Sequence, residues 1–475
     1  MTFTRRIISI VLFVVPLLLM SFTSGSYATN VQVETTLEDQ TDMAITIYND
    51  GTGLVKDTRL IQTPDGQFEL IFMDVASTID ATSVHFVSLT EPEALAILEQ
   101  NYEYDLVSTE ALYRRHIDKH VTIRTEDGRT IDGTLLSYSG SLVVQTEDGI
   151  VIVQNPIEVQ FEELPEGLIT RPTLRWSLIN SGGRSHECEM SYLASNMRWN
   201  ANYVAVVGPN DDRLDLTGWV TINNNSGTAY HDATLKLVAG EVHRVRPEYG
   251  YAGEMAMDMA MPRAAEGLGF EEESFFEYHL YTLQRPATLL NNQQKQINLL
   301  EGEGIGVEKI FVFDPGYAYY GRGDTAEGAI EVRLKFMNSE SNGLGIPIPA
   351  GVLRVYKEDS SGSLQFIGED RVDHTPKDEE IEIFLGEAFD IVGERVVLDR
   401  REIRYDTWEY DVEVTVRNHK DETVEITYWD HVWGDWEVRM SSHEYYRKDA
   451  STVEFIFPVE ADGETVLTYT IRREW

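Results

Sequence analysis

Residues 186–192 read His-Glu-Cys-Glu-Met-Ser-Tyr, and polar side chains alternate strictly with side chains that pack well in a protein core. Because successive side chains of a β-strand point to opposite faces, His186, Cys188, Met190 and Tyr192 share one face. We expect this face to be the buried face of a strand. A nucleophilic pair of Cys188 and His186 is the alternative to simple packing.

The same alternation recurs over most of the chain after residue 28, in runs of five to eight residues. Tight-turn dipeptides separate many of these runs. Asp-Gly is a strong hairpin signal because both residues tolerate positive φ, so the pattern predicts antiparallel strands. The dipeptides are Asp50-Gly51, Asp65-Gly66, Asp127-Gly128, Asp148-Gly149 and Asp462-Gly463.

A second recurring pattern is an alternating strand that ends in asparagine and polar or glycine residues, at 45–49, 178–180, 220–225, 336–338 and 414–418. Asparagine tolerates left-handed backbone and caps turns with its side chain. We therefore predict corners of at least two immunoglobulin-like β-sandwich units.

Two short helices are expected where the alternation lapses. Thr90 and Glu93 form a capping-box pattern before an apolar helical face, and a second helix is expected from Ser108 to its basic end at Arg114 and Arg115.

Composition excludes several classes of protein. The 475 residues include 80 Asp+Glu against 39 Lys+Arg, a formal charge of −41, and a single cysteine. Such a polyanion repels phosphate backbones and anionic lipid, so we expect no nucleic-acid partner. One cysteine forms neither an intrachain disulfide nor a thiolate metal cluster.

The amino terminus has the form of an export signal. Arg5 and Arg6 precede the apolar run 7–22, and the small-x-small sequence ending at Ala28 suits signal peptidase. Cleavage after Ala28 is expected. The run is shorter than the ~20 residues of a spanning helix, so an uncleaved anchor is the less favoured alternative. We expect an exported protein, periplasmic or extracellular, with no transmembrane segment after cleavage.

Residues 121–161 are expected to form a compact barrel of five strands. They resemble the first motif of the Sm-like small barrels through Val121, Ile123, Asp127-Gly128-Arg129, Gly133, Leu135, Tyr138 and Val144. Those barrels often bind RNA through an Asp and an Asn, where this chain has Ser139 and Leu142, so RNA binding is not expected.

A larger resemblance covers about residues 170–475. It is carried by Tyr192, Trp199, Ala201 and Tyr203, Asp215-Leu216-Thr217-Gly218-Trp219, Asn223 and Asn224, Leu237-Val238-Ala239-Gly240, Pro349-Ala350-Gly351, Val355-Tyr356, Leu385-Gly386-Glu387-Ala388-Phe389, Asn418-His419-Lys420 and Trp436. In this order the motifs resemble the bacterial domain of unknown function 4139 family, some members of which carry a mucoidy-inhibitor label. One departure is Asn196-Met197-Arg198 before Trp199, where those relatives more often have a glycine. The resemblance implies an exported β-rich protein and supplies no catalytic residue.

These observations predict a mainly β chain of several domains. The expected ranges are a signal peptide at 1–28, an N-terminal β region with short helices at 29–110, an Sm-like barrel at 111–165, a β-sandwich with a mobile loop over 246–273 at 166–400, and a C-terminal immunoglobulin-like β-sandwich at 401–475.

No metal or cofactor is predicted, although two patterns leave alternatives open. His116 and His120 have the i,i+4 spacing of a zinc pair, but no third ligand is near in sequence. Met255, Met257, Met259 and Met261 form a methionine run whose soft thioethers suit Cu(I), which gives copper handling as one alternative function.

The sharpest local signal is the segment 429–436, in which indoles could stack on sugar rings while carboxylates bond their hydroxyls. Its candidate ligand-binding residues are Trp429, Asp430, His431, Trp433, Asp435 and Trp436. The plainer interpretation is a sandwich core capped by tryptophans. Because no nucleophile elbow, Walker loop or HExxH motif is present, we predict a non-catalytic binding or structural module of the cell envelope, with an envelope glycan or a protein as partner. A carbohydrate-binding or hydrolytic envelope protein is the alternative.

Overall fold

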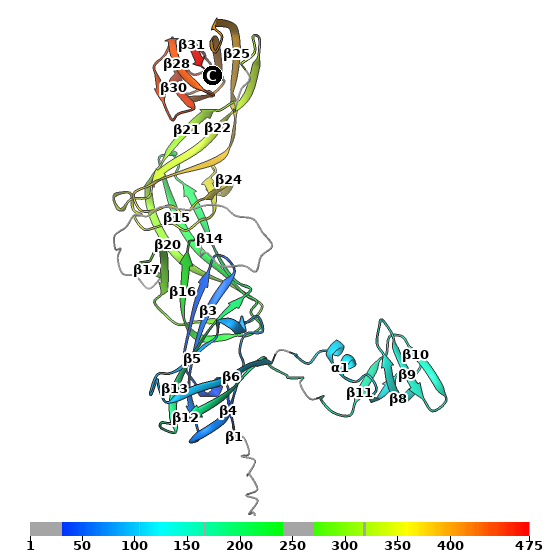
Figure 1. Cartoon of the computed structure of the whole chain (residues 1–475). Helices are drawn as coiled ribbons and strands as arrows, with labels where there is room; N and C mark the ends of the chain where they lie inside the picture. Colours follow the sequence, from blue (N-terminus) through cyan, green and yellow to red (C-terminus); the bar gives the residue numbers. More distant parts are fainter. Residues whose placement is uncertain (1–30, 104, 166–167, 241–269, 317–319, 475) are drawn as a thin grey trace, which may run out of the picture.

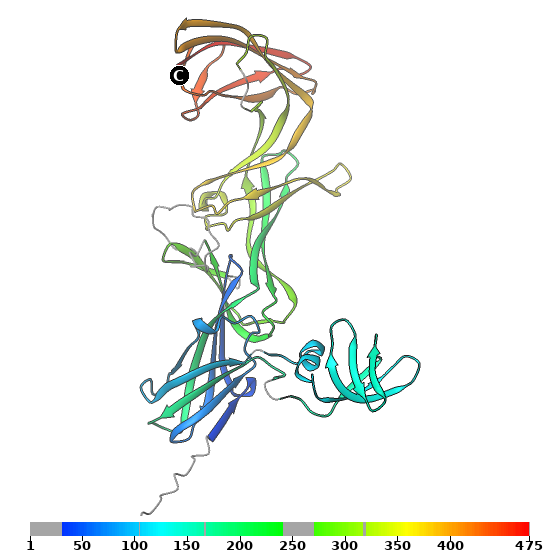
Figure 2. The same cartoon turned by 45° about the vertical axis from the view of Figure 1, so that its right-hand side comes forward.

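The computed structural model describes residues 31–103, 105–165, 168–240, 270–316 and 320–474, which are mainly β. Their strands form five sheets. Within these ranges α1 (Thr109–Arg115) is the one α-helix, beside the 3-10 turns η1 (Leu37–Asp39), η2 (Ala81–Ser83) and η3 (Glu340–Asn342). The predicted fold class is therefore confirmed. Four of the sheets build an elongated body with one long axis, and the fifth, with α1, projects to one side (Figure 1; Figure 2).

The first sandwich lies at the amino-terminal end of this axis. One layer is a four-stranded sheet in the order β1 (Val31–Thr35), β4 (Gly66–Met73), β12 (Thr173–Asn180) and β6 (Leu95–Glu103). The second layer belongs to an eight-stranded sheet with the order β17 (Phe270–Phe275), β18 (Tyr278–Leu283), β16 (Tyr230–Ala239), β2 (Gln40–Tyr48), β3 (Thr52–Gln62), β13 (Ser185–Ser195) and β5 (His85–Ser88), with β19 (Ala287–Leu289) beside β16. The layers meet where Trp176 packs on Phe86, with ring centroids 4.8 Å apart.

The middle sandwich shares the eight-stranded sheet. Its other layer has the order β20 (Gln293–Gly306), β15 (Arg213–Asn224), β14 (Met197–Val207), β23 (Gly351–Glu358) and β24 (Leu364–Val372). The indole N–H of Trp199 on β14 donates to the carbonyl of Val238 on β16, 3.2 Å away. One continuous apolar core fills both the first and the middle sandwich.

The C-terminal sandwich is a single curled sheet of nine strands. Their order is β28 (Asp435–Ser441), β31 (Glu464–Glu474), β26 (Thr407–Asn418), β25 (Glu380–Arg404), β22 (Thr325–Met337), β21 (Glu308–Phe313), β27 (Val424–His431), β30 (Thr452–Val459) and β29 (Tyr445–Arg447). Five other strands lie between β30, which carries Phe455, and β31, which carries Tyr469, yet the two ring centroids are 4.8 Å apart, so the sheet closes on its own core.

Two long strands join the middle and C-terminal sandwiches without a linker. Phe336 of β22 and Ile383 of β25 belong to the first core, while Ile330 and Ile391 of the same strands belong to the second. β22 and β25 stay paired from one core to the other, with register shifts between Ala329 and Ile330 and between Val332 and Arg333. The predicted boundary at 400/401 is therefore wrong, because β25 runs through it and the C-terminal sheet already begins at β21.

The projecting sheet has the order β10 (Gly149–Val153), β9 (Leu142–Thr146), β8 (Thr130–Ser137), β7 (His120–Arg124) and β11 (Glu158–Phe161), around its own small core. The chain makes it as an insertion between β6 and β12, which pair with each other. β12 also pairs with β4, and β13 pairs with β3. The predicted separation of 29–110 from 166–400 is therefore wrong, because strands from both ranges make the same sheets.

The two helix predictions had different outcomes. The helix at 109–115 is confirmed, with the Ser108 hydroxyl accepting the Ala111 N–H and Arg114 and Arg115 in its last turn. The helix predicted from Thr90 is wrong, because residues 95–103 form β6, paired with β12. The loop predicted over 246–273 lies outside the described residues as far as 269, and 270–273 begin β17.

Three of the five Asp-Gly dipeptides close hairpins, between β2 and β3, β7 and β8, and β9 and β10. Those at 65–66 and 462–463 instead connect strands that do not pair, β3 to β4 and β30 to β31. Four strand pairs are parallel, namely β1 with β4, β2 with β16, β14 with β23 and β21 with β27. The prediction of antiparallel strands thus holds for most pairs only.

Buried asparagines lie at the predicted corners. Asn180, Asn224, Asn338 and Asn418 are at most 3% exposed, and each ends a strand where the chain crosses to another layer. None of the four has a positive φ, so side-chain capping, and not left-handed backbone, explains them. Asn49 differs, with a single long hydrogen bond of 3.4 Å from the Gly240 N–H.

Candidate functional site

The predicted sugar-binding segment 429–436 is split between the core and the surface. Trp429 is only 6% exposed, and its indole N–H donates to Glu454 at 2.8 Å. The ammonium of Lys448 lies 3.2 Å from the centroid of the Trp429 ring, and the Arg333 guanidinium lies 5.1 Å from it. The indole face is therefore already occupied by cations of the same chain.

Asp430 is fully buried, and its carboxylate interacts with polar side chains in the core of the C-terminal sandwich. Its Oδ2 accepts hydrogen bonds from the hydroxyls of Tyr320, at 2.7 Å, and Tyr469, and its Oδ1 is 3.3 Å from Nε of the equally buried Arg395. Burial, together with the charge of Asp430, raises the pKa of Tyr320 and Tyr469 well above the usual value. Asp430 is thus a structural counter-ion and does not reach a ligand at the surface.

The other predicted residues lie apart. His431 bonds Asp314 at 3.0 Å and Thr452 at 3.1 Å, whereas Trp433, beyond the end of β27, is 56% exposed. Asp435 and Trp436 line a shallow depression of about 280 Å³, but Trp436 is mostly buried, donates to a backbone carbonyl and lies under the Arg447 guanidinium. The six residues therefore do not form one surface.

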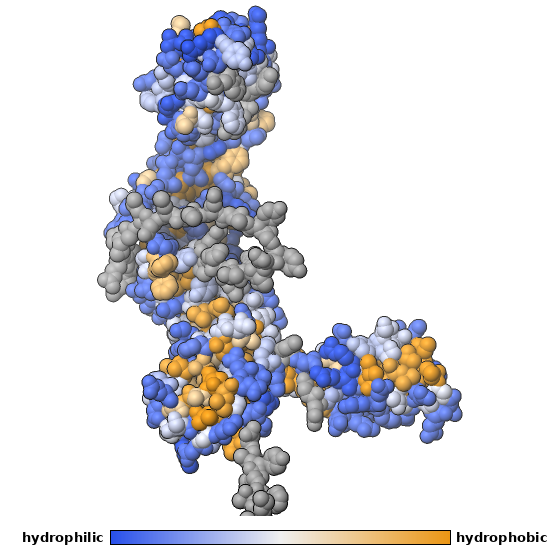
Figure 3. Space-filling view, in the orientation of Figure 1, coloured by the Kyte–Doolittle hydropathy of each residue, from blue (hydrophilic) through white to orange (hydrophobic). Residues whose placement is uncertain are grey.

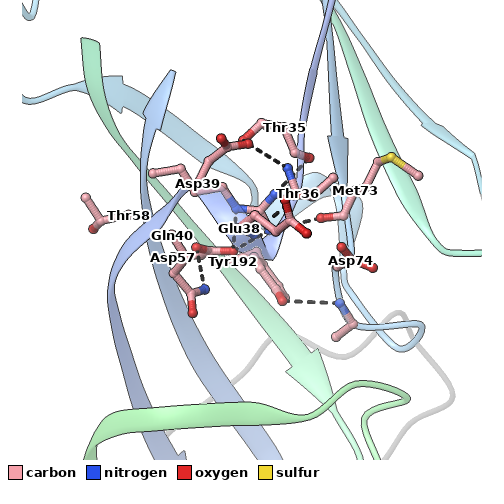
Figure 4. Close-up of polar contacts among 12 residues, drawn as sticks. Thr35, Thr36, Glu38, Asp39, Gln40, Asp57, Thr58, Met73, Asp74 and Tyr192 are labelled. Carbon is pink, nitrogen blue, oxygen red and sulfur yellow. Dashed lines mark hydrogen bonds and ion pairs between the residues drawn. The ribbon is translucent and has the colours of Figure 1, made fainter. Parts of the chain in front are cut away.

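A second buried ion pair lies in the first sandwich (Figure 4). Arg59 donates twice to Asp57 Oδ2, at 2.7 and 3.1 Å, and to the carbonyls of Thr35 and Met73. The second carboxylate oxygen of Asp57 accepts from Gln40 at 2.8 Å. Because these partners come from β1 to β4, the cluster fastens the first strand of the described chain to the core.

The burial of Cys188 agrees with the prediction that this side chain simply packs in the core. Cys188 is 0% exposed on the inner face of β13, and burial, with the charge of Glu187, raises its pKa to about 12. His186 is used otherwise, since its ring nitrogens lie 2.9 Å from the Ser88 hydroxyl and 2.8 Å from the Gly183 carbonyl. These contacts give no activated thiolate.

The two histidines considered for zinc do not face a common ion. His116 caps α1 and packs on Phe161, with ring centroids 4.4 Å apart, while His120 starts β7 beside Glu162. Among the described residues no group of three or more His, Cys, Asp or Glu could hold a metal. The methionine run 255–261 lies outside the described residues.

The outer face of the middle sandwich carries a set of side chains that the sequence analysis missed. β14, β15 and β20 are adjacent, and their register aligns three rows of three residues on the outer face, of which only the central one, Thr221, is buried, at 4% exposed. We call these nine residues the amide face: Arg198, Asn223 and Gln294; Asn200, Thr221 and Gln296; Asn202, Trp219 and Asn298. The alternating amides at 200 and 202 and at 294, 296 and 298 are visible in the sequence, but their alignment depends on strand pairing.

Trp219 is the aromatic centre of one edge row, between Asn202 and Asn298. It is 38% exposed, and among the described residues its ring has no aromatic or cationic neighbour, unlike Trp429 and Trp436. The Thr221 hydroxyl accepts from the amides of Asn202, at 3.1 Å, and Gln296, at 3.2 Å. The amide face therefore places an exposed indole beside aligned amide groups, with the cationic Arg198 two rows away.

The face that Figure 3 shows is mainly hydrophilic, and hydrophobic residues gather on it over the projecting sheet and the first sandwich. On edge strand β10 both Ile150 and Ile152 are 64% exposed. None of the helices described is long and apolar enough to cross a membrane.

No family model matches the chain, and no curated protein matches it.

Proposed function

We propose that the chain is a non-catalytic binding or structural module exported to the bacterial cell envelope. The observation that carries the proposal is the continuity of β22 and β25 through two cores. Paired strands that leave one core and enter the next hold the sandwiches in a fixed orientation, unlike domains on a flexible linker. Such an arrangement suits a molecule that presents separate surfaces at fixed distances.

The export part of the proposal is supported by the sequence at the amino terminus. Arg5 and Arg6, the apolar run 7–22 and the small residues before Thr29 have the form of a cleaved signal. Cell fractionation and amino-terminal sequencing test it, with Thr29 expected as the first residue of the exported chain. A full-length chain retained in the cytoplasm would overturn export.

The resemblance to the domain of unknown function 4139 family is part of the same proposal. Its motifs fall mostly on core strands: Tyr192, Trp199 and Tyr203 are buried between the layers, and Asn418 makes a corner. Asn196-Met197-Arg198, the stretch where relatives more often have a glycine, begins with Asn196 at φ 62°, a conformation that glycine also adopts readily. These positions support a shared architecture and assign no reaction.

Co-sedimentation with envelope material tests the binding function. The purified protein is mixed with peptidoglycan sacculi and with extracted envelope polysaccharides, and the supernatants are assayed for released sugars and peptides. We expect saturable binding without release above a heat-treated control. Release that scales with protein concentration and survives purification would overturn the non-catalytic assignment.

A further inference from the structure

We infer that the amide face binds an uncharged polysaccharide chain, with Trp219 as the stacking platform. This inference rests on the proposed binding function and names its ligand class. The occupant follows from the chemistry of the nine side chains, from their charge and from the shape of the surface that carries them.

The composition of the amide face departs sharply from that of the chain. Six of its nine residues are Asn or Gln, whereas the whole sequence has only 18 Asn and 13 Gln among 475 residues. None of the nine is acidic, although the chain has 80 acids. Charged residues alone are enough to keep an exposed protein surface soluble, so solubility does not explain this concentration of amides.

The amide groups match the hydrogen-bonding capacity of sugar hydroxyl groups. Each Asn or Gln offers two N–H donors and a carbonyl acceptor in one plane, and a sugar hydroxyl both donates and accepts. Asn202 and Gln296 each use one amide N–H on Thr221, which fixes the two side chains. Asn200 is exposed and Asn223 is half-buried, and neither side chain makes a hydrogen bond to another described residue.

The indole supplies the apolar half of sugar recognition. An aromatic face is negative and attracts the weakly positive C–H groups on the face of a pyranose ring. Trp219 is exposed within a row whose neighbours are Asn202 and Asn298, so a ring stacked on it has amide groups on both sides. Strands hold such groups more rigidly than loops do, which lowers the cost of ordering on binding.

Charge and shape select an uncharged polymer. The net charge of −41 repels polyanions, and two carboxylates lie next to the Trp219 row: Glu301 accepts a hydrogen bond from the Asn298 amide at 2.9 Å, and Asp215 lies four residues before Trp219 on β15. A pocket that surrounds a small ligand is typical of monosaccharide sites, whereas the amide face is the open surface of a sheet. It therefore contacts several units of an extended chain and gives little affinity for one sugar.

Affinity electrophoresis tests the inference on the purified full chain. Native gels contain soluble β-glucan, xylan or galactomannan as neutral probes, and alginate or heparin as anionic probes. We expect at least one neutral polymer to retard the protein, the anionic polymers not to do so, and free monosaccharides not to compete. Retardation by anionic polymers alone, or by none, would overturn the inference.

Matched variants locate the binding surface. Trp219→Ala and Asn200→Ala should each weaken binding, the first by about tenfold or more, as expected for loss of an aromatic contact. Trp433→Ala removes an exposed indole elsewhere and should leave binding unchanged. Unchanged thermal unfolding shows that each variant is folded, and equal binding by Trp219→Ala and the wild type sinks the assignment.

The outcomes separate this inference from the proposed function. If Trp219→Ala still co-sediments with envelope material as the wild type does, the protein remains a binding module but the amide face is not its site. If the wild type binds no envelope fraction and no polymer, both proposals fail.

Discussion

At the scale of single residues, four asparagines secure the places where the chain changes layers. The Asn418 amide donates to the carbonyls of Glu422, Val459 and Glu460 at 2.8 to 3.2 Å, and its oxygen accepts the Lys420 N–H. Asn180 and Asn224 repeat this arrangement with the N–H two residues ahead. One side chain thus satisfies several buried backbone groups that the turn leaves unpaired.

Replacing Asn418 with alanine should destabilise the C-terminal sandwich. Buried carbonyls lose their donor, and the expected loss in free energy of unfolding is about 2–4 kcal/mol. Asn418→Asp should cost at least as much, because a carboxylate repels the same carbonyls. Asn101→Ala, at an exposed position, is the control and should be nearly neutral. Urea unfolding measures all three, and a neutral Asn418→Ala would contradict the capping role.

The buried Asp430–Arg395 pair predicts a different pattern. Asp430→Asn keeps the shape but leaves the Arg395 charge buried without its counter-ion, so we expect a loss of about 3–5 kcal/mol. Adding Arg395→Met should recover much of this loss, because both charges are then gone. Asp435→Asn is the exposed control. If the double variant were no more stable than Asp430→Asn, the loss would not arise from the unpaired charge.

At the scale of elements, β13 passes into β14 through one residue that switches the chain between sheets. Asn196 is that residue, with φ 62°. Asn196→Gly should therefore stay within about 1 kcal/mol of the wild type, whereas Asn196→Val should cost about 1–2 kcal/mol or more, because a β-branched side chain is strained there. Ser195→Val, in regular strand geometry, is the control. Equal unfolding midpoints for the glycine and valine variants would rule out the backbone explanation.

The positions of strands were predictable because alternation of polar and apolar residues is a local signal. The pairing of strands was not predictable, because it depends on residues far apart in the sequence. The alternation at 186–192 predicts β13 and its buried face correctly, and the Asn corners were visible for the same reason. The capping-box pattern at Thr90 failed because pairing with β12, far away in sequence, determines the conformation of 95–103.

The candidate site was also misplaced, because residues that cluster in the sequence were expected to share one surface. Trp429 and Trp433 are neighbours in sequence but end up buried and exposed, respectively. Asn200, Trp219 and Gln296 are far apart in sequence and become neighbours only through the register of β14, β15 and β20. The amides that alternate within single strands could have been noticed in the sequence. The row that contains Trp219 could not, because it forms only when the three strands pair.

At the scale of the whole molecule, Asp211 connects the middle and C-terminal sheets. It lies between β14 and β15, 2.5 Å from Lys309 of β21, and it also pairs with Lys357 of β23. Burial works to raise the pKa of Asp211, but the hydrogen bonds and charges of Lys309 and Lys357 outweigh it, so the pKa lies below the usual value.

The lowered pKa fixes the sign of the pH dependence. The unfolded carboxyl titrates near pH ~3.9, so the contribution of Asp211 is complete above that pH and is lost as pH falls through the lower folded value. Asp211→Asn should cost ~1 kcal/mol near neutral pH, and the difference from wild type should vanish in acid. Asp212→Asn is the adjacent control. Thermal unfolding from neutral to acid pH measures this, and a constant difference would contradict it.

The continuity of β22 and β25 predicts how the molecule unfolds. Ile383 and Ile391 lie on the same strand but in different cores, so loss of either core frays the strand that the other needs. The core of the projecting sheet contains no residue of these strands, and its ends join the rest at the Leu106–Ile169 bridge. Calorimetry should therefore show two transitions, one for the sandwiches and one for the projecting sheet.

Matched core truncations assign these transitions. Ile383→Ala and Ile391→Ala should each lower the same transition, by about 2–5 kcal/mol in stability, while Val144→Ala should lower only the other. If Ile383→Ala and Ile391→Ala moved two separate transitions, the sandwiches would be independent domains on a deformable joint. The surfaces of the two sandwiches would then not be held at fixed distances, and the protein would not be a rigid binding module.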